Sequence, residues 1–112
     1  MKGSSVARMA VMVVAAALEV LGDALIRKGM RGAGIWLVAL GFIVLGSYGV
    51  VVNRLALDFS SLLGAYVGFF AIVSVLFGRF FFKEAIPTST WVGLGVVLAG
   101  SLIIQLGSGI AP

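Results

Sequence analysis

Four long apolar runs, separated by short segments that hold most of the charged residues, constrain this chain more than any other feature. The runs cover about residues 9–26, 35–52, 59–82 and 90–106. A helix needs about 20 mainly apolar residues to cross the hydrocarbon core of a bilayer, and each run is close to that length. The sequence therefore predicts an all-α membrane protein in which residues 1–112 form one domain of four transmembrane helices with short loops.

The composition excludes several classes of function. Of the 112 residues, 62% are hydrophobic and 11% are charged, whereas soluble domains have about 25% charged residues. The four apolar runs leave too few residues for a soluble catalytic domain. Histidine and cysteine are absent, which excludes a thiol nucleophile, an imidazole base, and zinc or haem sites built on those ligands. The chain has no G-x-x-x-x-G-K-[ST] loop for phosphates. We expect no enzymatic activity, no cofactor and no metal, and we expect any transport to draw on a gradient.

The basic residues lie singly between the apolar runs, which favours contact with lipid headgroups over contact with nucleic acid. Short connections make successive helices antiparallel neighbours, with both termini on one side of the membrane. The positive-inside rule then gives only a weak preference for termini outside, because the bias between the two sides is small. The terminal side carries Lys2, Arg8 and Arg54, and the other side carries Arg27, Lys28, Arg31, Arg79 and Lys83.

Glu19 is the most informative residue, because it lies about ten residues into the first apolar run. A charged carboxylate near the bilayer centre is costly, so we expect this side chain to face protein or trapped water and to exchange a proton. A group that holds either a proton or a cation couples the export of one to the import of the other. The other interpretation is a protonated glutamic acid that is hydrogen-bonded to a neighbouring helix.

Asp23 follows four residues after Glu19, on the same helix face, and Arg27 follows four residues after Asp23. Asp23 either pairs with Arg27 near the interface or takes part directly in binding, and the sequence leaves both interpretations open. Tyr66 lies well inside the third run, where its hydroxyl needs a partner and its ring is suited to an organic cation. The phenylalanines of the third run are predicted to be packing and lipid-facing residues; they are Phe69, Phe70, Phe77, Phe80, Phe81 and Phe82.

Glycines mark the predicted helix contacts. Gly64 and Gly68 form a G-x-x-x-G pattern in the third run, and such small residues let backbones approach closely in lipid. Four helices of this length barely enclose a cavity for a small organic molecule, so transport requires a second copy. We predict a homodimer through the fourth helix, with Gly93, Gly95 and Gly100 at the interface.

Three segments carry a family resemblance: Leu18-Glu19-Val20-Leu21-Gly22 followed by Arg27-Lys28, Phe81-Phe82-Lys83-Glu84, and the glycine-rich run from Trp91 to Ile104. With these segments the chain resembles the small multidrug resistance transporters over nearly its whole length. These are bacterial four-helix proteins that work as antiparallel homodimers and exchange protons for cationic compounds.

The resemblance implies a multi-pass protein of the bacterial inner membrane that exports small cationic or amphipathic organic compounds in exchange for protons. Glu19 matches the shared proton and substrate site, and Tyr66 matches a third-helix tryptophan. Gly93 and Gly100 match the dimer-forming glycines. The implied partners are a second copy of the chain, cationic small molecules, protons and membrane lipids.

Two departures from the family pattern affect which substrate is expected. Leu63 stands where the family has a substrate-gating tyrosine, and Gly22 replaces the tryptophan of the guanidinium-export branch. A second hypothesis is therefore a non-transporting accessory subunit packed on a larger complex, or a lipid- or polyamine-handling member of the same superfamily. A Glu19 that is accessible in a cavity favours transport, whereas a Glu19 sealed against another chain favours the accessory subunit.

Overall fold

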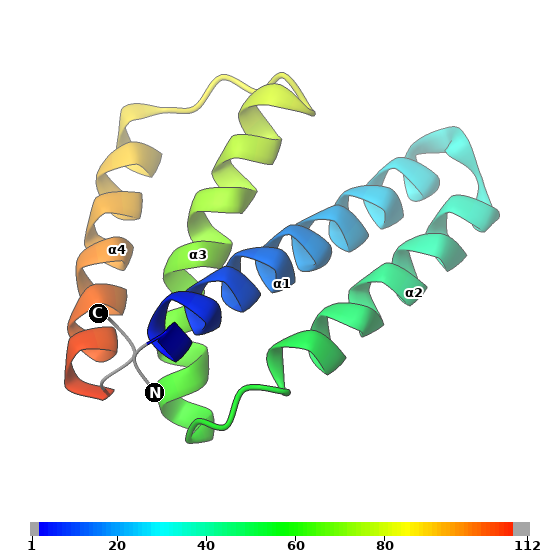
Figure 1. The fold of residues 1–112 in the computed structure, drawn as a ribbon. Helices are drawn as coiled ribbons and strands as arrows, with labels where there is room; N and C mark the ends of the chain where they lie inside the picture. The colour runs from blue at the N-terminus through cyan, green and yellow to red at the C-terminus, as the bar shows by residue number, and fades with distance from the viewer. Residues whose placement is uncertain (1–2, 109–112) are drawn as a thin grey trace.

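The protein consists of four long helices joined by short connections (Figure 1). The structure is a computed structural model that describes residues 3–108, so Lys2 and the ends of the predicted domain, residues 1–2 and 109–112, lie outside the described residues. All four helices are long and apolar enough to cross a membrane. Residues 3–108 contain no strand, and the predicted all-α membrane fold is confirmed. The helices are α1 (Gly3–Lys28), α2 (Ile35–Val52), α3 (Phe59–Phe80) and α4 (Thr88–Ser108).

Some helices begin or end at other residues than the apolar runs do. At these places the backbone geometry, and not the hydropathy, determines where the helix begins or ends. α2 covers the predicted residues 35–52, whereas α1 extends beyond 9–26 at both ends. α3 ends at Phe80, before the predicted residue 82, and the chain turns at Lys83, whose φ of 56° lies in the left-handed region. α4 begins at Thr88, before the predicted residue 90, because Pro87 favours a helix start and its carbonyl accepts the N–H groups of Thr90 and Trp91.

A π-helical turn, η1 (Gly29–Ala33), reverses the chain between α1 and α2. Gly32 has a φ of 125° and Gly34 a φ of 110°, values that residues with a Cβ rarely adopt. The N–H of Gly34 closes the turn on the carbonyl of Gly29 at 3.1 Å. These glycines allow α2 to fold directly back along α1.

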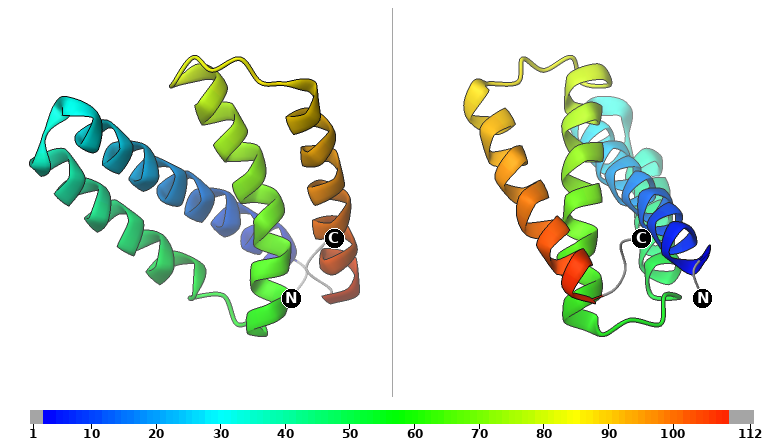
Figure 2. Two further views of the ribbon diagram at one scale, coloured as in Figure 1. Left: turned by 180° about the vertical axis from the view of Figure 1, so that it is seen from behind. Right: turned by 60° about the vertical axis from the view of Figure 1, so that its left-hand side comes forward.

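The helices form two hairpins that cross where α1 meets α3. α1 packs along α2, and α3 packs along α4, while α4 approaches neither α1 nor α2 within residues 3–108. The views of Figure 2 show the two hairpins diverging toward the α1–α2 turn. The fold is therefore open, with α4 supported by α3 alone in the described part of the chain.

The buried core is small and lies where α1, α3 and the end of α2 meet. Ala15 and Ala16 are fully buried, and their small side chains let α1 cross close to α3. Many large apolar side chains on α2 and α4 are exposed, as expected for helices that face lipid. The core residues are Met12, Ala15, Ala16, Val52, Leu62, Ala65 and Tyr66.

Candidate functional site

Glu19 lies near the middle of α1, beside the crossing with α3, and is half-buried. The hydroxyl of Tyr66 on α3 donates a hydrogen bond to its Oε1 at 2.7 Å. Tyr66 itself is 4% exposed and belongs to the core, so this donor is held in place by packing. The structure thus brings together two predicted site residues that are far apart in the sequence.

Tyr48 on α2 completes an aromatic group around this carboxylate. Its ring stacks on that of Tyr66 with centroids 5.4 Å apart, and the Phe70 ring centroid lies 6.3 Å from that of Tyr66. The sequence offers one signal for Tyr48, a tyrosine in the middle of an apolar span, but it does not indicate which helix face meets α1. The aromatic group therefore contains a residue that was absent from the predicted site.

Glu19 also lines a groove between α1 and α2 of about 470 Å³. Glu19 is thus hydrogen-bonded to Tyr66 and half-buried at the wall of this groove. The residues that line the groove are Glu19, Ile26, Phe42, Leu45, Gly46, Tyr48 and Gly49.

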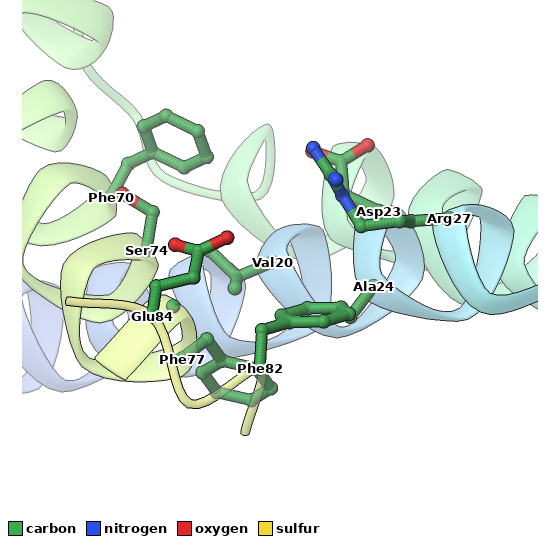
Figure 3. Close-up of a pocket in the computed structure, with 10 residues that line it drawn as sticks. Val20, Asp23, Ala24, Arg27, Phe70, Ser74, Phe77, Phe82 and Glu84 are labelled. Atoms are coloured by element: carbon green, nitrogen blue, oxygen red, sulfur yellow. The ribbon is translucent and has the colours of Figure 1, made fainter. Parts of the chain in front are cut away.

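Asp23 lines a separate cavity of about 210 Å³ between α1 and α3, drawn in Figure 3. Within residues 3–108 it forms no ion pair with Arg27, and the Arg27 guanidinium lies over the ring of Phe82 at 5.7 Å. The second predicted carboxylate therefore lies on the same helix as Glu19 but faces a different cavity.

The phenylalanines of the third apolar run do more than the packing and lipid contact predicted for them. Phe70, Phe77 and Phe82 line the Asp23 cavity, together with Glu84 from the α3–α4 connection. Figure 3 shows the Glu84 carboxylate on the side of the cavity opposite Asp23 and Arg27. Hydropathy alone could not separate these rings from lipid-facing ones, because the helix rotation decides which faces the cavity.

The G-x-x-x-G of α3 packs against α4 of the same chain. A Cβ on Gly68 would lie 2.5 Å from the Ser101 hydroxyl, and a Cβ on Gly64 would lie 2.6 Å from Ile104. The buried Ser101 hydroxyl donates to the carbonyl of Ala65 at 2.7 Å and accepts from Gln105 at 3.3 Å. These contacts fix α4 on α3.

Gly93, Gly95 and Gly100 are exposed, and an added Cβ at each would meet no atom within 4 Å. The three α4 positions predicted at the dimer interface are therefore unoccupied by the rest of the described chain. No group of three acidic residues suited to a metal ion occurs in residues 3–108.

Comparisons with known proteins identify relatives of this chain. No protein-family model matches the chain, and no solved structure matches it. A UPF0060 membrane protein of Synechocystis sp. is 29% identical over 94 residues, covering 83% of this chain and 87% of that protein. A UPF0060 membrane protein of Nocardia farcinica is 34% identical over 94 residues, covering 82% of this chain and 85% of that protein. The chain, with four helices able to cross a bilayer, is a multi-pass membrane protein and belongs to the UPF0060 membrane protein family.

Proposed function

We propose that the protein is a proton-coupled antiporter that exports small cationic or amphipathic organic compounds. The observation that carries this proposal is the Glu19 carboxylate, held in mid-span by the Tyr66 hydroxyl at 2.7 Å on a residue that lines the groove between α1 and α2. A carboxylate in an apolar span is costly unless it has a partner or a function, and Tyr66 supplies only one hydrogen-bond donor. The remaining acceptor capacity is available to a proton or to a cation.

Exclusive occupancy of Glu19 produces the exchange. A cation that binds requires the ionised carboxylate and therefore displaces the proton, and a proton that binds neutralises the charge that held the cation. The stacked rings of Tyr48 and Tyr66 offer π-faces beside the carboxylate, to which an organic cation is attracted. Transport then requires that the Glu19 site faces each side of the membrane in turn.

A second copy of the chain completes the transporter in this proposal. The two hairpins diverge, and α4 is supported by α3 alone within residues 3–108. An antiparallel pair that meets along the open glycine face of α4 would enclose a cavity between two Glu19 carboxylates. The resemblance to small multidrug resistance transporters supports the same arrangement.

The accessory-subunit hypothesis requires instead that the Glu19 carboxylate is sealed against another chain. Its position on the groove favours transport. The deciding experiment measures proton release by the purified protein on addition of quaternary ammonium, guanidinium or polyamine compounds, together with gradient-driven efflux from proteoliposomes. Glu19→Gln, which keeps the side-chain shape, should abolish both signals without loss of helix content.

The matched control is Asp58→Asn, which neutralises an exposed acid at the start of α3, far along the helix from Tyr66. This variant should keep the wild-type proton release and efflux. Gradient-driven efflux that persists in Glu19→Gln would refute the proposal. A response confined to one class of compound would identify the substrate.

A further inference from the structure

Two adjoining hollows lie at the end of the molecule that carries the α1–α2 turn. One is the cavity of Figure 3, and the other is a hollow of about 600 Å³. Asp23 and Arg27 line both, so the hollows share one wall on the last turns of α1. We call them together the paired hollows. The larger hollow is lined by Asp23, Ile26, Arg27, Met30 and Arg31.

This end of the molecule has the side chains of a membrane boundary. Trp36, near the start of α2, is 85% exposed, and Trp91, near the start of α4, is also exposed. Tryptophan gathers at the level of the lipid headgroups, as do lysine and arginine. Arg27, Lys28 and Arg31 lie at this same end. The paired hollows therefore open where phospholipid headgroups are present.

The charges of the paired hollows balance in number. Asp23 and Glu84 supply two negative charges, and Arg27 and Arg31 supply two positive charges. No ion pair or side-chain hydrogen bond joins any of them to another side chain in residues 3–108. Charges of both signs are therefore left to bind a ligand, which should itself carry both.

Local contacts hold two of these charges in place. The Glu84 N–H donates to the carbonyl of Gly78 at 2.9 Å, and its carboxylate lies so close over Gly78 that a Cβ there would be 2.6 Å from Oε1. The Arg27 guanidinium lies over the Phe82 ring. A ring has no hydrogen-bond acceptor oxygen, so the N–H donors of the guanidinium remain available to an anion.

We propose that the paired hollows bind the headgroup of an ethanolamine phospholipid, with the phosphate at Arg27 and Arg31 and the ammonium group between Asp23 and Glu84. Asp23 and Arg27 are four residues apart on α1, so these opposite charges follow at about 6 Å along one face, a span suited to the short ethanolamine linker. A primary ammonium has three donors for carboxylates, whereas choline has none. Met30, which is 77% exposed, and Ile26 offer an apolar surface to acyl chains, which favours a lipid over a free phosphate ester.

The experiment uses the full chain, purified and delipidated in detergent, and counts bound lipid by native mass spectrometry. Phosphatidylethanolamine, phosphatidylcholine and phosphatidylglycerol are titrated separately. The wild type should retain phosphatidylethanolamine best. Arg27→Gln should weaken its binding about two- to fivefold, the usual effect of one exposed ion pair. Asp23→Asn with Glu84→Gln should remove the preference over phosphatidylglycerol, because only basic residues then remain.

The controls are Arg54→Gln and Asp58→Asn, exposed residues of the α2–α3 connection that line neither hollow. Both should bind lipid as the wild type does. Equal retention of the three lipids, or equal losses in the control variants, would overturn the proposal by showing non-selective headgroup contact. Displacement by glycerophosphoethanolamine, which has no acyl chains, would overturn the lipid assignment.

If Arg27→Gln does not fold, the isosteric Asp23→Asn alone must reduce the preference over phosphatidylcholine. None of these outcomes depends on Glu19 or on transport.

Discussion

Replacing Gly41 with alanine tests whether close backbone packing of α2 on α1 sets the geometry of the site. Gly41 is buried, and a Cβ there would lie 2.6 Å from Cγ1 of Ile26 and 2.8 Å from the carbonyl oxygen of Gly22. The Ile26 side chain can move, but the Gly22 carbonyl belongs to the backbone of α1. Raising that 2.8 Å distance to the 3.4 Å of ordinary contact displaces the helices by about 0.6 Å.

Overpacking of this size costs about 1–3 kcal/mol, and the higher helix propensity of alanine offsets up to about 1 kcal/mol of it. We expect Gly41→Ala to lower the free energy of unfolding by about 1–2 kcal/mol. The displacement also moves Tyr48 on α2 relative to Glu19 on α1, so cation-induced proton release should weaken in the proposed antiporter. Unfolding is measured by circular dichroism in mixed detergent micelles with increasing dodecyl sulfate.

Gly46 and Gly49 provide matched controls on the same helix, because a Cβ at either position would meet no atom within 4 Å. Gly46→Ala and Gly49→Ala should leave the free energy of unfolding unchanged or raise it by up to about 1 kcal/mol. If Gly41→Ala is as stable as Gly46→Ala, the α1–α2 contact is looser than the structure has it. The reasoning from the Gly22–Gly41 contact would then be refuted.

Two further substitutions test the site and the proposed assembly. Tyr66→Phe keeps the buried ring and its stacking on Tyr48 but removes the donor to Glu19, so we expect little change in fold. Efflux should fall about 13- to 160-fold, which corresponds to the roughly 1.5–3 kcal/mol of a hydrogen bond to a charged group. Efflux at the wild-type rate would show that the hydroxyl does not position the carboxylate. Gly93→Leu with Gly100→Leu should yield monomers by light scattering in detergent, since both glycines lie on the open face of α4; dimers that persist would indicate another interface.

The sequence by itself determined the four spans and the unusual position of Glu19. Hydropathy is a local property, and a run such as residues 35–52 must form a helix in lipid because the bilayer offers its backbone no other hydrogen-bond partner. A carboxylate near the middle of such a run, as Glu19 is, is conspicuous because a charged group is costly in the bilayer centre. The reversal at Gly32 and Gly34 is also local, since it follows from the freedom of glycine to adopt a positive φ.

Only the tertiary structure decided which side chains surround that carboxylate. Tyr66 is 47 residues from Glu19 in the chain, and their hydrogen bond depends on the angle and rotation at which α3 crosses α1. The same rotation turns Phe70 and Phe77 toward a cavity instead of lipid, and it turns Gly64 and Gly68 toward α4. Apolar helices are nearly uniform in hydropathy around their circumference, so close contacts between small residues, and not the hydrophobic pattern, select the faces that meet.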